Sequence, residues 1–280
     1  MVKVSEGCQR SVVAGRRSLR HGLLGLRPIV RIHVFASASA LARALAGNIS
    51  RALSADPALI LGLPTGRTPI PLYDAIVRLH RAGRADFSRA TTFNLDEFLG
   101  LEPRDPRSYR AFMQRHFFDD VNLSPQRIQF LNGATRNVER ECLRYEHAIE
   151  RAGGIGLQIL GLGMNGHIGF NEPARALVAR THCTRLKPAT RRANAALFDN
   201  RVSAVPREAL SMGMATILHA KRIVLLATGA SKARCVQRMI EGPVTPRLPG
   251  SFLQLHRNAE IWLDGAAAAR LGRPRSAPTT

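Results

Sequence analysis

Apolar and polar positions follow two different periods in successive segments of the chain. Short, mostly apolar runs alternate with stretches in which apolar residues recur every three or four positions, as on one face of a helix. The short runs predict strands at 29–35, 58–63, 90–95, 127–131, 157–162, 181–186, 222–228, 250–256 and 260–264. The longer period predicts helices after Ser37 or Ser39, through 73–80, and at 108–117, 139–152 and 209–218. This alternation predicts a single α/β domain whose mostly parallel sheet carries helices on both faces.

The two ends of the chain depart from this pattern. Residues 1–28 hold six basic residues against one acid, Glu6, and predict a basic flexible extension. That segment superficially fits an Arg-rich transit peptide, but a flexible extension, or a start assigned too far upstream, is the preferred interpretation. Residues 266–280 are rich in Ala, Arg and Pro and predict a disordered tail. We therefore place the α/β domain at 29–265.

Charge is the most unusual feature of the composition, with a formal net charge of +21 at pH 7. Of the 41 basic residues only Lys3, Lys187, Lys221 and Lys232 are lysines, and the 37 arginines are scattered along the chain. Aromatic residues, at 5%, do not interleave with them as a nucleic-acid stacking platform requires. We interpret the excess as compositional bias and expect no nucleic-acid partner. No apolar run approaches the roughly 20 residues that span a bilayer, so we expect no membrane partner either.

The four cysteines are Cys8, Cys142, Cys183 and Cys235, and they lie far apart. They form neither a CxxC pair nor a zinc-ligand spacing. Reduced thiols in a cytoplasmic protein are the simplest interpretation.

Polar loops follow four of the predicted strands. Because the carboxyl ends of parallel strands meet at one edge of the sheet, these loops are expected to share one cleft, where Rossmann-like folds bind small ligands. The residues are Thr65, Gly66, Arg67 and Thr68; Asp96 and Glu97; Asn165, His167 and Glu172 in a Gly-rich loop; and Lys232.

Each of these loops also has a plainer interpretation. The 65–68 loop opens a helix and can offer backbone N–H groups to an anion, but it can also be a simple turn. Asp96 and Glu97 can be a helix cap or catalytic carboxylates, and Lys232 can be a surface charge. A lone His is often structural, but His167 lies five residues before Glu172 in a Gly-rich loop after a strand, and that combination favours a site.

Six motifs carry a resemblance to a known family. They are LGLPTGRTP, TFNLDEFLGL, SYRAFM, GLGMNGHIGFNEP, VPREALSMG and TGASKA. In order and spacing they resemble the glucosamine-6-phosphate deaminases, relatives of the 6-phosphogluconolactonases, from about residue 29 to about 264. The glycine loops are weak signals singly, but FNLDEF and GHIGFNEP together are specific.

The resemblance implies that the chain converts glucosamine 6-phosphate and water to fructose 6-phosphate and ammonia. By that resemblance Asp96 moves a proton between C2 and C1 of the opened sugar, His167 helps to open the ring, and Glu172 supports His167. It implies a phosphorylated amino sugar as partner, no redox cofactor and no metal, and it leaves a homo-oligomer open. The phosphate needs N–H groups and cations, which Gly66, Arg67, Thr68 and Lys232 can offer.

Three positions depart from the family pattern. Asn165 stands where some members have Asp, and it can still orient His167 by hydrogen bonding. Ala196 stands where the family has a phosphate-binding Arg, so that Arg191 or Arg192 are alternatives. His182 and Thr184 stand where regulated members have basic residues, so we expect weak or absent activation by N-acetylglucosamine 6-phosphate.

Other functions remain open from the sequence alone. A 6-phosphogluconolactonase-like hydrolase is disfavoured by Asp96 and by the FNEP ending. A galactosamine-6-phosphate deaminase is not distinguished by any residue. A non-catalytic sugar-phosphate sensor is disfavoured because the acids and the His are retained and because 28 residues are too few for a DNA-binding domain.

Overall fold

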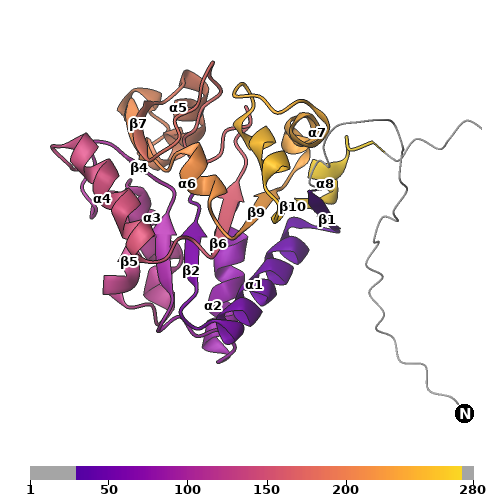
Figure 1. Cartoon of the computed structure of the whole chain (residues 1–280), viewed down its shortest axis with the longest axis horizontal. Coiled ribbons are helices and arrows are strands. Elements are labelled where there is room, and N and C mark those ends of the chain that lie inside the picture. The colour runs from indigo at the N-terminus through magenta and orange to yellow at the C-terminus, as the bar shows by residue number, and fades with distance from the viewer. Residues whose placement is uncertain (1–29, 273–280) are drawn as a thin grey trace, which may run out of the picture.

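A seven-stranded sheet forms the centre of the molecule in the computed structural model, which describes residues 30–272 (Figure 1). Its order is β1-β10-β9-β6-β2-β3-β5, and every neighbouring pair is parallel. The strands are β1 (Arg31–Phe35), β2 (Ile60–Leu63), β3 (Thr91–Asn94), β5 (Ile128–Gln129), β6 (Leu157–Gly161), β9 (Arg222–Ala227) and β10 (Ala259–Asp264). The predicted parallel α/β fold is confirmed.

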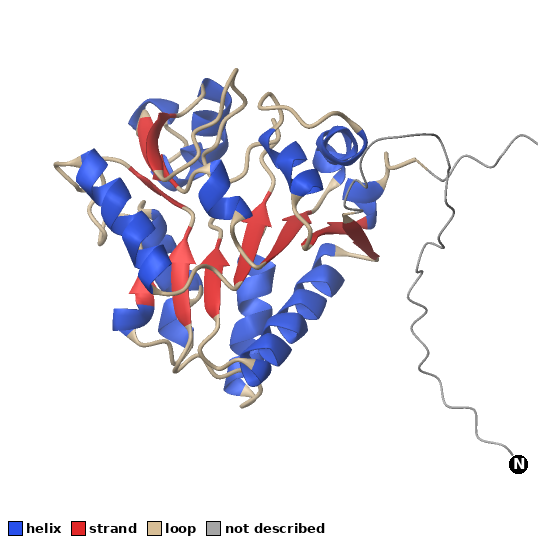
Figure 2. Ribbon diagram, in the orientation of Figure 1, coloured by secondary structure: helices blue, strands red, loops and turns tan. Residues whose placement is uncertain are grey.

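Helices cover both faces of this sheet, as Figure 2 shows. They are α1 (Ala38–Ala55), α2 (Ile70–Arg81), α3 (Tyr109–His116), α4 (Val138–Arg151), α6 (Met214–Leu218), α7 (Ala233–Glu241) and α8 (Gly265–Ala268). Ser37 and Ser108 cap α1 and α3, accepting hydrogen bonds from the N–H groups of Ala40 (3.1 Å) and Ala111 (3.0 Å). Hydroxyls at these positions satisfy N–H groups that have no partner within the helix.

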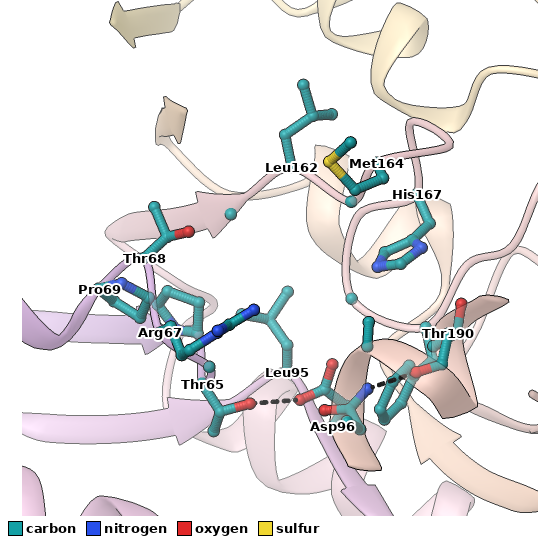
Figure 3. Close-up of a pocket in the computed structure, with 18 of the residues that line it drawn as sticks. Thr65, Arg67, Thr68, Pro69, Leu95, Asp96, Leu162, Met164, His167 and Thr190 are labelled. Carbon is teal, nitrogen blue, oxygen red and sulfur yellow. Dashed lines mark hydrogen bonds between the residues drawn. The ribbon is translucent and has the colours of Figure 1, made fainter. Parts of the chain in front are cut away.

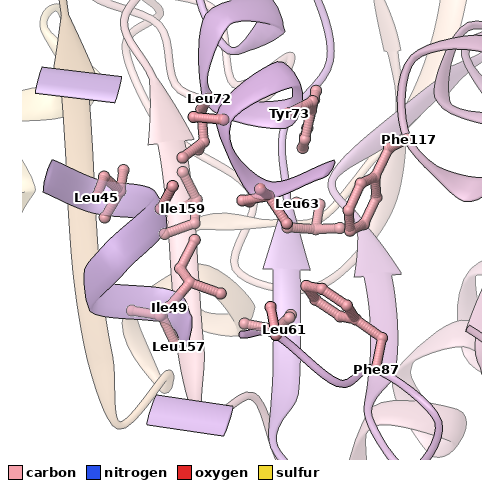
Figure 4. Close-up of a cluster of buried hydrophobic side chains, with 14 of the residues drawn as sticks. Leu45, Ile49, Leu61, Leu63, Leu72, Tyr73, Phe87, Phe117, Leu157 and Ile159 are labelled. Carbon is pink, nitrogen blue, oxygen red and sulfur yellow. The ribbon is translucent and has the colours of Figure 1, made fainter. Parts of the chain in front are cut away.

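Two apolar cores lie on opposite faces of the sheet, which explains why the central strands are almost continuously apolar. In β9, Val224 and Leu226 belong to the core under α1 and α2, whereas Ile223 and Leu225 belong to the core under α4, α6 and α7. Figure 4 shows the first of these cores, with the side chains of α1 and α2 packed on β2 and β6.

A second sheet lies at the carboxyl ends of the main strands (Figure 1). It is antiparallel, with the order β4-β8-β7, where β4 is Asp96–Phe98, β7 is His182–Arg185 and β8 is Glu208–Ser211. Helix α5 (Pro188–Asn194) and two 3-10 turns, η3 (Ala195–Phe198) and η4 (Val202–Ala204), join β7 to β8. A third cluster, which includes Phe98 and Phe198, fills the space between these elements. This subsheet was not predicted, although its strand β7 falls on the expected strand at 181–186.

Two element predictions were wrong. A single helix was expected at 209–218, but its first part is β8, because Ala209 and Leu210 pair with β4 on one side and β7 on the other. Tertiary strand pairing outweighs their helix propensity. A strand was expected at 250–256, but the structure has the 3-10 helix η6 (Pro249–Leu255). Pro249 has no N–H for a strand ladder and suits the start of a helical turn.

Several composition-based expectations concern the ends of the chain. Residues 1–28 and most of the predicted tail lie outside the described residues. At the C-terminal side, α8 continues past the expected boundary at 265 and buries Ala267.

No helix within residues 30–272 is long and apolar enough to cross a bilayer. Cys142, Cys183 and Cys235 are free thiols, and Cys8 lies outside the described range.

Gly133 allows a loop to approach the back of β4, and this contact generates a prediction. A Cβ at Gly133 would lie 2.2 Å from the carbonyl oxygen of Phe98 and 2.9 Å from that of Leu101. We expect Gly133→Ala to lower the free energy of unfolding by about 1–3 kcal/mol, as overpacking does. Urea denaturation measures this. Gly47→Ala in α1 is the matched control, because its Cβ meets only the Arg51 side chain at 3.6 Å. It should stabilise by about 0.5–1 kcal/mol, and equal effects of the two variants would contradict the packing argument.

Candidate active site

A cavity of about 420 Å³ opens at the carboxyl edge of the main sheet. It collects the loops after β2, β6 and β9, the start of β4, and one side of α5, so segments distant in the sequence share it, as predicted. The predicted residues that line it are Thr65, Gly66, Arg67, Thr68, Asp96, Asn165, His167 and Lys232. Figure 3 shows Asp96 and His167 facing this common space, with Thr65 and Arg67 on the side of Asp96.

Two of the predicted acids stand behind the cavity wall. Glu97 and Glu172 are both buried, and neither lines the cavity. Five polar residues line it that were not predicted as site residues, namely Tyr109, Thr190, Asn194, Thr228 and Ser231. The motif SYRAFM contains Tyr109, but nothing in the spacing shows that its hydroxyl reaches the cleft.

Asp96 is the carboxyl at the floor of the cavity. It is 6% exposed, and the Thr65 hydroxyl donates to its Oδ1 at a distance of 3.4 Å. Burial and the neighbouring carboxyl of Glu97 raise the pKa of Asp96 to about 8, although the hydrogen bond from Thr65 acts in the opposite direction. A carboxyl with such a pKa exchanges protons readily near neutral pH, which suits a group that takes a proton and returns it.

Glu97 caps a helix, which was one of the two roles considered for it. The helix is α3, which begins twelve residues further along the chain. Its carboxylate accepts hydrogen bonds from the backbone N–H groups of Tyr109 (3.0 Å) and Arg110 (2.9 Å), in the first turn of α3, and from Phe98 (2.8 Å). Burial raises the pKa of Glu97 to about 7 despite these hydrogen bonds. The acid pair therefore divides its roles, because Asp96 faces the cavity and Glu97 holds the start of α3.

The loop that carries His167 depends on two glycines. A Cβ at Gly163 would lie 2.4 Å from the His167 ring, so the ring occupies the space that any other residue would fill. Gly166 has a φ of 89°, and a Cβ there would meet Leu248 at 2.2 Å. The backbone N–H of His167 donates to Asn165 Oδ1 at 3.2 Å. This tight turn holds the imidazole against the cavity.

Glu172 supports His167 from behind. Its Oε2 lies 3.7 Å from the buried Nδ1 of His167 and accepts a 2.8 Å hydrogen bond from Asn165, while its Oε1 accepts one from the Thr190 hydroxyl. Burial acts to raise the pKa of Glu172, but His167 and the hydrogen bonds from Thr190 and Asn165 outweigh it and lower the pKa to about 2. The Glu172 carboxylate therefore stays ionised where it faces the imidazole.

Two cations, Arg67 and Lys232, also line the cavity. Lys232 donates from Nζ to the carbonyl oxygen of Leu162 at 2.7 Å. Burial lowers the pKa of Lys232; the thiol of Cys235 acts to raise it, and the positive charge of Arg67 adds to the lowering. Arg67 is thus close enough to Lys232 for their charges to repel. Gly66, at φ 92°, shapes the loop that places Arg67 at the start of α2.

The described residues around Ala196 do not replace the missing phosphate-binding Arg. Ala196 itself is exposed and does not line the cavity. Arg191 points elsewhere, since its guanidinium donates to the carbonyl oxygens of Val202 (2.7 Å) and Val205 (2.9 Å). Arg192 is exposed and is also absent from the lining. The positive charge in the cavity therefore comes from Arg67 and Lys232.

The pKa of Asp96 predicts how stability depends on pH. A folded-state pKa of about 8, against about 3.9 for an unperturbed Asp, means that the folded chain holds a proton which the unfolded chain releases. This group's contribution to stability is therefore full below about pH 4 and is lost as pH rises to about 8.

We expect Asp96→Asn to raise the free energy of unfolding at pH 9 by on the order of a few kcal/mol, and to change it little at pH 4. Urea denaturation at the two pH values measures this. Asp74→Asn, which removes an exposed carboxyl on α2, is the control for the change in net charge. A gain for Asp96→Asn that is the same at both pH values would contradict the assigned cause.

Comparison with known proteins agrees with the motifs. The model of the family described as glucosamine-6-phosphate isomerases/6-phosphogluconolactonase matches residues 35–262. A glucosamine-6-phosphate deaminase of Alkaliphilus metalliredigens is 43% identical over 239 residues, which cover 85% of this chain and 98% of the relative. That of Halothermothrix orenii is 47% identical over 215 residues, or 77% of this chain and 89% of the relative.

Solved structures give the same result. One described as a monomeric glucosamine-6-phosphate deaminase superposes with a TM-score of 0.83 at 38% identity, covering 86% of this chain and all of that one. A 6-phosphogluconolactonase from Trypanosoma cruzi has a TM-score of 0.70 at 18% identity, with 89% and 99% covered, and shares the fold alone. The resemblance drawn from the motifs is confirmed: the chain belongs to the family of glucosamine-6-phosphate isomerases and 6-phosphogluconolactonases.

Proposed function

We propose that this protein is a glucosamine-6-phosphate deaminase, which converts glucosamine 6-phosphate and water to fructose 6-phosphate and ammonia. The observation that carries the proposal is the cavity itself. A carboxyl with a raised pKa, Asp96, and an imidazole backed by a carboxylate, His167, face one space that two cations, Arg67 and Lys232, also line. The relatives' names support the same activity.

The phosphate is the part of the substrate that the cations bind. Arg67 and Lys232, with the N–H groups of the 65–68 loop, offer charge-assisted hydrogen bonds to a dianion. An anion between them also relieves their mutual repulsion. Because the same cavity holds Asp96 and His167, a phosphate bound by these cations keeps the sugar carbons within it, so that binding energy is used for orientation.

Ring opening is the step assigned to His167. The pyranose opens when a proton leaves the O1 hydroxyl and a proton is given to O5, which frees the aldehyde at C1. Imidazole can perform both transfers near neutral pH. Glu172, whose pKa is lowered to about 2, stays ionised and faces Nδ1 of His167 during both transfers.

Asp96 then carries out the isomerisation. Its carboxylate takes the proton from C2 while the ammonium group of the substrate gives a proton to O1, which leaves an enolamine. Asp96 then returns its proton to C1, which leaves an iminium at C2. Water adds to this carbon, ammonia leaves, and the ketone of fructose 6-phosphate remains. Asp96 must be ionised for the first transfer and protonated for the second, and a pKa of about 8 allows both near neutral pH.

An ammonia-release assay tests the proposal directly. Glucosamine 6-phosphate should release ammonia and fructose 6-phosphate in equal amounts, whereas 6-phosphogluconolactone should not be hydrolysed above its spontaneous rate. Galactosamine 6-phosphate, run beside them, reports the preference for the epimer at C4. Lactone hydrolysis without ammonia release, or tight binding of glucosamine 6-phosphate without turnover, would overturn the proposal in favour of a lactonase or a sugar-phosphate sensor.

The pH dependence of kcat/KM follows from the burial of Asp96. Because the free enzyme needs this carboxyl ionised, we expect kcat/KM to fall about tenfold per pH unit below a midpoint near pH 8. Steady-state rates between pH 5 and 9.5 measure the limb. Asp96→Asn should abolish ammonia release while the variant still binds fructose 6-phosphate. A midpoint near 4, the value of an ordinary Asp, would remove Asp96 as the base.

The cation pair predicts a change in substrate affinity. We expect Arg67→Ala and Lys232→Ala each to raise KM about 10- to 100-fold, since a hydrogen bond to a charged group contributes about 1.5–3 kcal/mol. The kcat values should change less, because neither side chain stands at the reacting carbons. Lys221→Ala, at an exposed position before β9, is the control. A KM unchanged in both variants would place the phosphate elsewhere.

A further inference from the structure

The hydroxyl of Tyr109 joins two parts of the cavity wall that are far apart in the sequence. Tyr109 is the first residue of α3, and its Oη donates a 2.9 Å hydrogen bond to Asn194 Oδ1 at the end of α5. Thr65, whose hydroxyl donates to Asp96, lines the same cavity. Both Tyr109 and Asn194 line the cavity.

The phenol ring is held rigidly, so its hydroxyl is a fixed reference point. The ring is 4% exposed and stacks on Phe170 at 5.8 Å between centroids and 14° between planes. It also packs against Phe98 at 4.6 Å. The backbone N–H of Tyr109 is bound by Glu97, so the carboxyl next to Asp96 fixes the residue from the other side.

From Asn194 the hydrogen bonds continue to Glu172, the carboxylate that faces His167. Asn194 Nδ2 donates to the carbonyl oxygen of Thr190 at 3.0 Å, and the Thr190 hydroxyl donates to Glu172 Oε1. Glu172 faces Nδ1 of His167. A continuous series of polar contacts therefore runs from the phenol on α3, through α5, to the group assigned to ring opening.

Helix α5 needs such an external tie. It has only seven residues, too few to be stable by itself, and of these only Thr190 is buried. Arg191 braces it to the following turn through the carbonyl oxygens of Val202 and Val205. The contact of Arg191 joins α5 only to the turn that follows it, whereas the hydrogen bond from Tyr109 joins α5 to α3.

We propose that Tyr109 is a positioning residue, whose hydroxyl fixes Asn194 and Thr190 and, through them, the Glu172–His167 pair. The effect of this role on catalysis rests on the proposed deaminase activity, but its effect on the order of α5 and of His167 does not. The contrasting role is a purely packing one, in which the ring matters and the hydroxyl does not. Tyr109→Phe separates the two because it keeps the ring and removes the hydroxyl.

Hydrogen exchange without substrate is the first measurement. In Tyr109→Phe we expect the amides of 188–194 to exchange about two- to tenfold faster than in the unaltered protein, the effect of one lost hydrogen bond. The imidazole NMR resonances of His167 should shift. Tyr145→Phe is the matched control, since it also removes a buried hydroxyl. That hydroxyl donates a 2.6 Å hydrogen bond to the carbonyl oxygen of Asn94, and neither residue lines the cavity. It should leave both signals as they are.

A double-mutant cycle gives the second measurement. Because Tyr109 acts through Asn194, the effect of Tyr109→Phe on exchange should largely disappear in an Asn194→Ala background. In ammonia release we expect Tyr109→Phe to lower kcat about tenfold and to change KM less than twofold, since the cations are untouched. Unchanged exchange and unchanged His167 resonances in Tyr109→Phe, or effects that add fully with Asn194→Ala, would overturn the proposal. If the protein releases no ammonia at all, the exchange and NMR results still decide it.

Discussion

Asp96 and Glu97 stand next to each other in β4, and both carboxyls are buried. Removing two neighbouring acids from water is unfavourable unless one of them is compensated or protonated. Here the backbone N–H groups of α3 compensate Glu97, while Asp96 has only the long hydrogen bond from Thr65 and the charge of its neighbour. The pKa of Asp96 is raised for that reason, and the position of α3, the hydroxyl of Tyr109 and the reactivity of the cavity floor all depend on this one arrangement.

Backbone geometry does the corresponding work on the opposite wall. Gly163 leaves room for the His167 ring, and Gly166 adopts a φ that other residues avoid. The absence of a side chain at Gly163 therefore fixes where the imidazole lies. The hydrogen bonds that Asn165 and Thr190 donate to Glu172 hold the carboxylate that faces it. In a parallel sheet these loops come together because the strands that carry them end at the same edge, and hydrogen bonds such as that from Lys232 to the carbonyl oxygen of Leu162 join them there. The topology forms the cavity, and a few side chains that line it supply its chemistry.

Much of this could be predicted from the sequence, because apolar periodicity and motif order are local signals. They predicted the parallel sheet, the helices that begin after Ser37 or Ser39 and at Ser108, and the convergence of Asp96, His167 and Lys232 on one cavity. What could not be predicted depends on pairing between distant segments. Residues 209–211 read as helix until β4 and β7 are placed on either side of them, and the contact between Tyr109 and Asn194 spans 85 positions with no periodic signal.

The distribution of charge links these observations. Where the family pattern has an arginine, Ala196 lies in the segment that follows α5, whereas Arg67 extends from the loop after β2, in the rigid body of the fold. A phosphate bound by Arg67 and Lys232 therefore contacts only the loops of the main sheet. The segment around α5 then does not bind the phosphate. Contacts within the protein hold it in place, among them those of Tyr109 with Asn194 and of Thr190 with Glu172. Substrate affinity and the orientation of His167 are for this reason carried by different residues, and substitutions at the two sets should separate KM from kcat.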